Sequence, residues 1–159
     1  MRIIVTAGPT REYIDSVRFI SNASSGRMGF AVAAAAIAHG HEVTLLCGPV
    51  EPPADLPCEI VRFVSVAELK DALERQFPCC YALIMTAAVG DFRPEGLAGR
   101  KISRAGGPIT LRLVPTEDVL AGVATAKQPR QIVVAFAVED GPETEMQAKA
   151  RREMAAKNA

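Results

Sequence analysis

The sequence predicts an α/β domain of the Rossmann-like type, with a mostly parallel sheet between two layers of helices. Short β-branched segments alternate with helix-type segments along most of the chain. Such alternation favours a parallel sheet with helices on both faces, because parallel strands need long crossover connections. The chain has 159 residues, of which 49% are hydrophobic, enough for one domain with its own core. We therefore expect residues 1–159 to form a single domain.

The first half of the chain alternates clearly between strand and helix patterns. Residues 2–6 form a β-branched run closed by an Ala-Gly-Pro turn, which predicts a buried strand. The Ala-rich residues 28–39 predict a helix, because alanine favours helices and Gly40 follows as a stop signal. Residues 42–47 and 59–64 predict the second and third strands.

The pattern changes after one further helix and strand. Apolar residues at helical spacing predict a helix over 66–77, with Ser65 as its N-cap, and residues 81–86 predict a fourth strand. Residues 87–107 contain five glycines and show little periodicity, so we expect a functional loop there. The alternating residues 109–114 predict a strand with one wet face.

The last part of the chain completes the α/β pattern. The expected elements are a short helix, a strongly apolar strand and a charged helix, at residues 117–126, 131–138 and 143–157. Open parallel sheets bind ligands beyond the carboxyl ends of their strands. The candidate loops at those ends are residues 7–27, 87–104 and 139–142, and the unusual residues lie mostly in the first two.

Composition and charge exclude several classes of protein. Eighteen Lys and Arg residues balance eighteen Asp and Glu residues, which argues against a nucleic-acid surface. The longest apolar run, residues 30–38, is too short to span a membrane, and no signal peptide is visible. We expect a cytoplasmic protein. Its four cysteines lack metal-site spacing, so we expect reduced thiols in or near the core rather than a zinc site or a redox-active Cys79-Cys80 pair.

The loop after the first strand lacks the standard nucleotide-binding turns but offers an anion site. Neither Gly-x-Gly-x-x-Gly nor the phosphate loop ending in Gly-Lys-Ser/Thr is present. Ser24, Ser25 and Gly26 directly precede a helix, whose free amide hydrogens and dipole attract phosphate. Arg18 and Arg27 add positive charge. The alternative interpretation is that the two serines only cap the helix.

Five segments resemble motifs of the phosphopantothenoylcysteine synthetase family. They are TAGPTREYIDSVRFISNASSGRMG at residues 6–29, TAAVGDFRP at 86–94, GRKISR at 99–104, VVAFAVE at 133–139 and KN at 157–158. The first match covers about twenty positions, which makes it far more specific than a short motif. The Met-Gly pair that ends it is similar to the bacterial form, which uses CTP rather than ATP.

The resemblance implies a ligase of coenzyme A biosynthesis. In the family reaction, the carboxylate of 4′-phosphopantothenate attacks the α-phosphate of CTP, with Mg²⁺ as cofactor, and gives an acyl-cytidylate and pyrophosphate. The amine of cysteine then displaces CMP. The resemblance also implies a homodimer, and it leaves open whether a flavin-dependent decarboxylase is a separate partner.

The resemblance further implies roles for individual residues. Asn22 matches the asparagine that holds the acyl-cytidylate, Arg18 the arginine that carries the intermediate to product, and Lys101 the lysine that meets the triphosphate. Asp91 matches an acid that contacts the nucleotide, through Mg²⁺, although no residue is assigned as a direct metal ligand. The other nucleotide-binding matches are Gly8, Ser24, Ser25, Gly26, Ala87, Ala88, Phe136 and Lys157.

Each of the main assignments has a simpler alternative. The alternatives are Asn22 as a turn former, Arg18 as the ion-pair partner of Asp15, Lys101 as a solvated side chain, Asp91 as a cap and Phe136 as plain core.

The sequence departs from the family pattern at three places. Thr116 stands where the family has Asn, and Ser103 and Arg104 replace two lysines. Glu153 replaces the first of two lysines spaced four apart, with Lys149 one turn earlier on the same face. The family also continues beyond the point where this chain ends, so we expect the domain to lack that C-terminal segment. Two further hypotheses therefore stay open: a non-catalytic nucleotide-binding relative and, less favoured, an NAD(P)-dependent Rossmann reductase.

Overall fold

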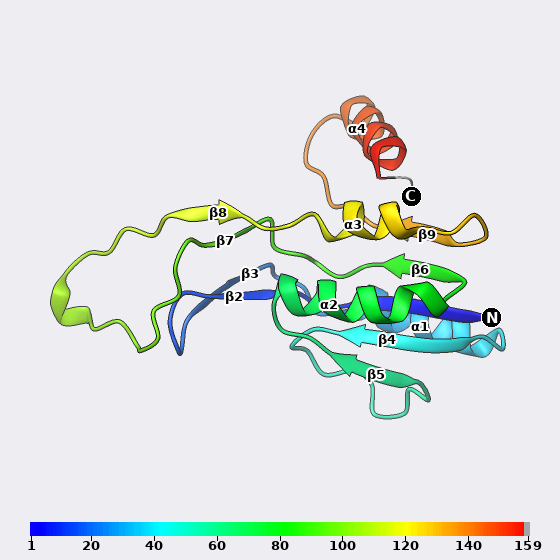
Figure 1. Ribbon diagram of the computed structural model, residues 1–159, viewed down its shortest axis with the longest axis horizontal. Helices are drawn as coiled ribbons and strands as arrows, with labels where there is room; N and C mark the ends of the chain where they lie inside the picture. Colours follow the sequence, from blue (N-terminus) through cyan, green and yellow to red (C-terminus); the bar gives the residue numbers. More distant parts are fainter. Residues whose placement is uncertain (158–159) are drawn as a thin grey trace.

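The computed structural model describes residues 1–157, and it confirms the three-layer α/β architecture (Figure 1). A five-stranded, fully parallel sheet lies at the centre. Its strands, in spatial order, are β5 (Glu59–Arg62), β4 (Glu42–Cys47), β1 (Arg2–Ala7), β6 (Ala82–Met85) and β9 (Ile132–Ala135). From β1 the chain adds β4 and β5 on one side of the sheet and then β6 and β9 on the other side. The strand order therefore reverses between β1 and β6, which makes their carboxyl ends a topological switch point.

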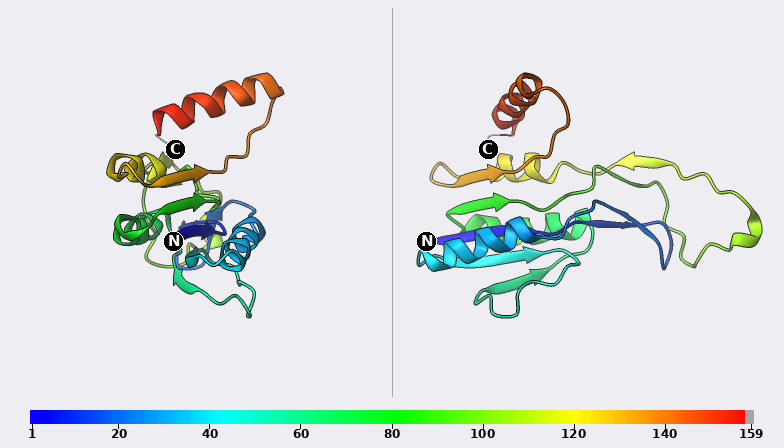
Figure 2. Two further views of the ribbon diagram at one scale, coloured as in Figure 1. Left: turned by 90° about the vertical axis from the view of Figure 1, so that its right-hand side faces the viewer. Right: turned by 180° about the vertical axis from the view of Figure 1, so that it is seen from behind.

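The pleat of β1 divides its side chains between two cores. Alternate residues beginning at Ile3 pack with α1 (Arg27–Ala38) on one face of the sheet. Ile4 packs on the other face, in a cluster that includes α2 (Val66–Gln76) and α3 (Val119–Ala126). Figure 2 shows α1 on one side of the sheet and these two helices on the other. Both faces of the three inner strands, β4, β1 and β6, are covered, which explains why most of their residues are buried and apolar.

Side-chain caps begin two of the helices. The Ser65 hydroxyl accepts a hydrogen bond from the Glu68 N–H (3.2 Å) at the start of α2, as predicted, and the Asp118 carboxylate accepts one from the Ala121 N–H (3.0 Å) at the start of α3. The last helix, α4 (Glu143–Ala156), has no buried residue and lies beyond the β9 edge of the sheet (Figure 2). Within residues 1–157, no helix is both long and apolar enough to cross a membrane.

The prediction for residues 109–114 is wrong, because these residues lie in an arm, residues 92–115, that projects from the central sheet (Figure 1). They were expected to form a strand in the alternating α/β pattern, but only β8 (Leu113–Pro115) forms there, and it pairs antiparallel with β7 (Phe92–Pro94) outside the central sheet (Figure 1). The alternating apolar side chains do not face the core, since Ile109 and Leu113 are 51% and 42% exposed. The 3₁₀ turn η2 (Arg104–Gly106) lies at the far end of this arm (Figure 1).

A second ribbon lies within the loop that follows β1. The short strands β2 (Arg11–Tyr13) and β3 (Phe19–Ser21) pair antiparallel in this segment, which was expected to be a loop without strands of its own. The ribbon is tied to the sheet edge, because the Arg11 N–H donates to the Val64 carbonyl (2.8 Å). The loop is long because it contains a hairpin.

All four cysteines lie in the described part of the chain and are free thiols. Cys47 and Cys80 are buried, as expected for core residues, whereas Cys58 is half-buried and Cys79 is exposed. Burial raises the pKa of the Cys80 thiol to about 11 and also raises the pKa of Cys47. Both buried thiols are therefore protonated at neutral pH, which suits packing rather than nucleophilic chemistry.

Candidate active site

A cavity of about 1080 Å³ opens at the switch point between β1 and β6. It is bounded by the loops after β1, β6 and β9, by the starts of α1 and α3, and by one face of α4. Open α/β sheets bind ligands at this position. Of the twelve predicted site residues, nine line the cavity: Asn22, Ser24, Ser25, Gly26, Ala87, Ala88, Asp91, Phe136 and Lys157. Asn158, which belongs to one of the matching motifs, lies outside the described residues.

The start of α1 is an open helix end that faces this cavity. Gly26 is the N-cap, with a φ of 76° that disfavours any residue with a side chain, and no side chain in the described chain caps the helix. Ser24 instead accepts a bond from the Gly26 N–H (3.4 Å). The interpretation that the two serines cap the helix is therefore wrong. The first-turn amides of α1 have no intrahelical partner and remain available to an anion.

Gly29 lets α1 approach β1 closely. A Cβ atom at this position would lie 2.5 Å from the Cβ of Ala7 and 2.8 Å from the carbonyl oxygen of Thr6, so any side chain would push the helix away. The sequence reasoning assigned Gly29 no role of its own. The sequence feature that could have indicated this role is a glycine near the start of an otherwise Ala-rich helix, since glycine within a helix often marks close packing.

Hydrogen bonds join the loops after β1 and β6 into one floor for the cavity. The buried Thr6 hydroxyl oxygen accepts a bond from the Ala87 N–H (3.0 Å). The Ala88 N–H donates to the Gly8 carbonyl (3.0 Å), and the Ala88 carbonyl accepts from the Thr10 N–H (3.2 Å). Gly8 therefore supports the floor without lining the cavity. Neither threonine was singled out from the sequence, because their partners are about 80 positions away.

Asn22 bridges the same two loops through its side chain. Its amide nitrogen donates to the carbonyl oxygens of Ala88 (3.3 Å) and Val89 (3.0 Å), at the wall of the cavity. These bonds hold the amide in place, and a ligand oxygen at this wall would have to share or replace one of them. Asn22 therefore does more than form a local turn, since its partners lie 66 and 67 positions further along the chain.

Ion pairs organise the wall that α4 contributes. The Lys157 amine lies 3.2 Å from the Asp118 carboxylate and 4.0 Å from Glu153, while the Lys149 amine lies 2.7 Å from Glu139 and 3.9 Å from Glu153. Burial raises the pKa of Asp118, but bonds from the backbone at the start of α3 and from Lys157 outweigh it and leave the pKa lowered. The hydrogen bond to Glu139 raises the pKa of Lys149. Both lysines therefore face the cavity as cations that already have partners.

Asp91 and Phe136 line the cavity from the loops that follow β6 and β9. The Asp91 carbonyl accepts a bond from the Thr116 N–H (2.9 Å), and the Thr116 hydroxyl donates to the Gly90 carbonyl (2.6 Å). The departure at Thr116 thus keeps the loop after β6 tied to the loop before α3. Phe136 is 50% exposed and follows the end of β9, so the interpretation of its ring as plain core is wrong.

The structure does not bring Arg18 and Lys101 to this cavity. Arg18 lies in the turn between β2 and β3, where its guanidinium donates to the Ile102 carbonyl (2.8 Å) and lies 3.6 Å from the Asp15 carboxylate. Lys101 is exposed on the adjoining loop, next to Ile102. The two residues therefore lie on neighbouring loops, Arg18 in the turn of the β2–β3 ribbon and Lys101 within the projecting arm.

Asp15 fastens these two loops together, and the sequence reasoning considered it only as an ion-pair partner. Its buried carboxylate accepts bonds from the N–H groups of Val17 (2.8 Å) and Arg18 (2.8 Å) at one oxygen and of Ile102 (3.1 Å) at the other. The Arg18 backbone bond is the main cause that lowers the pKa of Asp15, against the opposing effect of burial. The carboxylate is therefore ionised at neutral pH.

Replacing Asp15 by Asn is expected to loosen the arm without unfolding the sheet. An amide carries a donor in place of one carboxylate oxygen, so it cannot accept bonds on both sides, and one backbone N–H loses its partner. The Ile102 amide should exchange with solvent faster in Asp15→Asn, measured by hydrogen exchange. Folding lowers the pKa of Asp15. In the wild type, the protection of the Ile102 amide from exchange should therefore be complete above the ordinary pKa of Asp. It should be lost as the pH falls through the lowered pKa of Asp15.

Glu95→Gln provides the control, since Glu95 is an exposed carboxylate on the same arm, paired with Arg112. Unchanged exchange at Ile102 in Asp15→Asn would show that Asp15 does not hold the arm.

Comparison with known proteins places this geometry in a family. The profile of the family described as DNA/pantothenate metabolism flavoprotein C-terminal domain matches residues 1–159. The chain is 46% identical over 143 residues to a Cysteine/Cysteine sulfinic acid decarboxylase from an unknown prokaryotic organism, covering 89% of this chain and 40% of that protein. It is 44% identical over 147 residues to the Coenzyme A biosynthesis bifunctional protein CoaBC of Mycobacterium tuberculosis, covering 88% of this chain and 35% of that protein.

A solved structure shows the same fold. The crystal structure of the C-terminal domain of a Coenzyme A biosynthesis bifunctional protein CoaBC superposes with a TM-score of 0.83 at 35% identity, covering 99% of this chain and 73% of that one. The chain spans well under half the length of each of the two curated relatives, the decarboxylase and the CoaBC protein. It belongs to the DNA/pantothenate metabolism flavoprotein C-terminal domain family, which confirms the resemblance to phosphopantothenoylcysteine synthetases inferred from its motifs.

Proposed function

We propose that this domain joins 4′-phosphopantothenate to cysteine through an acyl-cytidylate made from CTP. The observation that carries the proposal is the meeting of three distant segments, residues 22–29, 85–91 and 135–139, around one cavity at an uncapped helix start. Each segment contains residues that match a nucleotide-binding motif. A cavity of about 1080 Å³ is large enough for a nucleotide together with a second substrate.

The charges of the cavity suggest how a triphosphate would bind. Its lining includes three cationic residues, Arg27, Lys149 and Lys157, and five acidic ones, Asp91, Glu117, Asp118, Glu139 and Glu153. A triphosphate would be repelled by that excess unless a divalent cation accompanied it. Mg²⁺ prefers one or two carboxylates together with phosphate oxygens, and Asp91 suits that arrangement. Within residues 1–157 no cluster of three or more acidic, His or Cys side chains forms a ready-made metal site, so the ion would arrive with the nucleotide.

The remaining residues have complementary tasks in this proposal. The open amides at the start of α1 would bind phosphate oxygens. Ala87 and Ala88 are small enough to let the nucleotide approach the backbone floor. The half-exposed ring of Phe136 would stack against the base.

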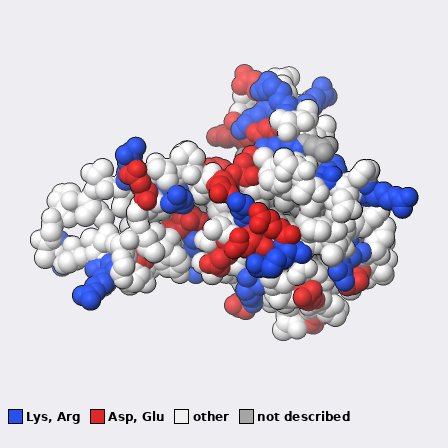
Figure 3. Space-filling model, in the orientation of Figure 1, with Lys and Arg blue, Asp and Glu red and all other residues white. Residues whose placement is uncertain are grey.

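We further infer that a second copy of the chain completes the site. Arg18 and Lys101 lie outside the cavity of their own chain, Lys101 within an arm that exposes several large apolar side chains and Arg18 beside it. Leu97 and Phe92 on this arm are 68% and 52% exposed. The face of the arm that is visible in Figure 3 carries few charged side chains. Exposed apolar surface of this kind is typical of an interface. A two-fold pairing would cover the arm and could carry Arg18 and Lys101 to the partner's cavity.

Pyrophosphate release tests the proposed function. We expect the protein with CTP, Mg²⁺ and phosphopantothenate to release pyrophosphate without cysteine, and CTP to raise the melting temperature more than ATP. Saturation to about 100 times Kd stabilises by about 2.7 kcal/mol, or roughly 5–10 °C for a domain of this size.

The contrary outcomes separate the other hypotheses. CTP binding without pyrophosphate release would favour the non-catalytic relative. An equal or larger shift with ATP would overturn the choice of nucleotide, and a shift with NADPH alone would favour the reductase.

A further inference from the structure

A second cavity of about 440 Å³ adjoins the first. Residues 22–25 line both cavities and therefore form their common wall. The other sides of the small cavity come from the β2–β3 ribbon, with Arg11 and Phe19, and from the loop after β4, with Pro49 and Val50. No role assigned above uses this cavity, although it lies next to Asn22, the residue that the motif resemblance assigns to the acyl-cytidylate.

Arg11 gives the small cavity a positive character. Among its lining residues, all in the described part of the chain, Arg11 is the one charged side chain, and none is acidic. The guanidinium donates to the Pro49 carbonyl (3.3 Å), and its central carbon lies 4.4 Å from the centre of the Phe19 ring. These contacts fix the orientation of the guanidinium but use only one of its five N–H donors. The planar group is therefore held ready for an anion that can accept two parallel bonds, as a carboxylate does.

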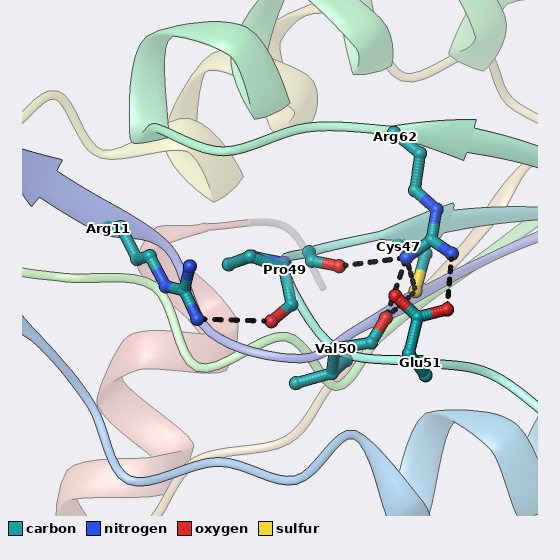
Figure 4. A network of polar contacts seen from close by, with 7 residues as sticks. Arg11, Cys47, Pro49, Val50, Glu51 and Arg62 are labelled. Carbon is teal, nitrogen blue, oxygen red and sulfur yellow. Dashed lines mark hydrogen bonds and ion pairs between the residues drawn. The ribbon is translucent and has the colours of Figure 1, made fainter.

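A network of polar contacts makes the loop after β4 a rigid wall (Figure 4). The Arg62 guanidinium donates to the carbonyl oxygens of Val50 (2.6 Å) and Gly48 (3.4 Å) and to the Glu51 carboxylate (3.3 Å). Arg11 holds the same loop from the other side, at Pro49, as the labelled side chains in Figure 4 show. The cavity is thus formed before any ligand arrives, which avoids an ordering cost on binding.

We propose that this small cavity binds the amino-acid substrate, with its α-carboxylate on Arg11. The inference rests on the proposed ligase function and names the subsite of its second half-reaction. In an α-amino acid the carboxylate lies only two bonds from the amine, so a carboxylate held by Arg11 keeps the amine near the common wall at Asn22. The apolar surfaces of Phe19, Pro49 and Val50 suit a thiol side chain.

The phosphate of phosphopantothenate is the other anion that Arg11 could meet. A long chain separates that phosphate from the carboxylate that becomes activated. An acyl group at Asn22 would therefore place the phosphate far from the adjoining cavity. The proximity of Arg11 to the common wall favours the short amino acid.

The reaction at the wall balances without another reactant. Cysteine enters as an ammonium ion and loses one proton to water. The amine nitrogen attacks the acyl carbon, so that a C–N bond forms and the C–O bond to the cytidylate breaks. CMP leaves with that electron pair on its phosphate oxygen, and the nitrogen releases its second proton to water.

Arg11→Gln tests the subsite with two amines, cysteine and cysteamine, of which cysteamine lacks the carboxylate. Steady-state amide formation in Arg11→Gln should show a KM for cysteine raised about 10- to 100-fold, as expected for loss of a charge-assisted pair. The KM for cysteamine and the rate of pyrophosphate release without amine should stay near wild type. Arg11→Lys should fall between, because it keeps the charge but not the planar fork.

Arg62→Gln is the matched control, because it loosens the same loop but leaves the charge of the cavity intact. It should affect cysteine and cysteamine alike. An equal loss with both amines in Arg11→Gln would make Arg11 purely structural and overturn the proposal. A raised KM for phosphopantothenate with an unchanged KM for cysteine would assign the cavity to the phosphate instead. Absence of pyrophosphate release in the wild type, an assay that needs no amine, would refute the ligase itself, and this subsite with it.

Discussion

Asn22→Asp is expected to stop amide formation while pyrophosphate release survives in part. In the wild type, the amide nitrogen of Asn22 donates to the carbonyl oxygens of Ala88 and Val89. Aspartate would place a carboxylate oxygen against those acceptors, which removes both bonds and adds repulsion between the two loops. The new charge would also repel the anionic phosphodiester of an acyl-cytidylate. Loss of such a contact commonly lowers the rate about 100-fold or more.

Separate quantification of the two products makes this result informative. The variant should receive CTP, phosphopantothenate and cysteine, and pyrophosphate and phosphopantothenoylcysteine should be measured in parallel. Asn22→Ala is the matched control, because it loses the two bonds without adding a charge, and it should be less impaired. Melting temperatures report whether the loops still hold together. Wild-type rates of both products in Asn22→Asp would show that Asn22 only joins the loops.

Lys101→Gln is expected to suppress pyrophosphate release about 100-fold while the fold stays intact, because a cation that meets the triphosphate would be lost. Lys101 is exposed and outside both core clusters, so its replacement should leave the melting temperature unchanged. Arg112→Gln is a suitable control, since Arg112 is a 77% exposed cation on the same arm, paired with Glu95. Wild-type release from a folded Lys101→Gln variant would remove Lys101 from the site.

Mixing the two variants tests whether Lys101 acts in the partner's cavity. In a mixed dimer of Lys101→Gln and Asn22→Asp chains, one of the two sites would combine a wild-type Asn22 with a wild-type Lys101 from the other chain. With random pairing, amide formation should recover to about a quarter of the wild-type level. Confirmed mixed dimers without recovery would place both residues in a site built by one chain.

Much of the fold could be predicted because it depends on local patterns. The β-branched run at residues 2–6 became β1, and the Ala-rich segment closed by Gly40 became α1 within one residue at each end. The arm was missed for a physical reason. Alternation at residues 109–114 indicates that one face is apolar, but that pattern is the same whether the core or a separate molecule covers the face.

The sequence by itself determined the order of the central strands and of the helices, the loops at the carboxyl edge and the family motifs within them, because these depend on residues adjacent in the chain. Only the tertiary structure decided that Gly26, rather than either serine, begins α1, and that Arg18 and Lys101 lie outside the cavity. It also revealed Asp15 as the fastening between two loops and Arg11 as the cation of a second cavity. These features depend on contacts such as that between Asp15 and Ile102, 87 positions apart, and no local pattern encodes which distant backbone groups a buried carboxylate will meet.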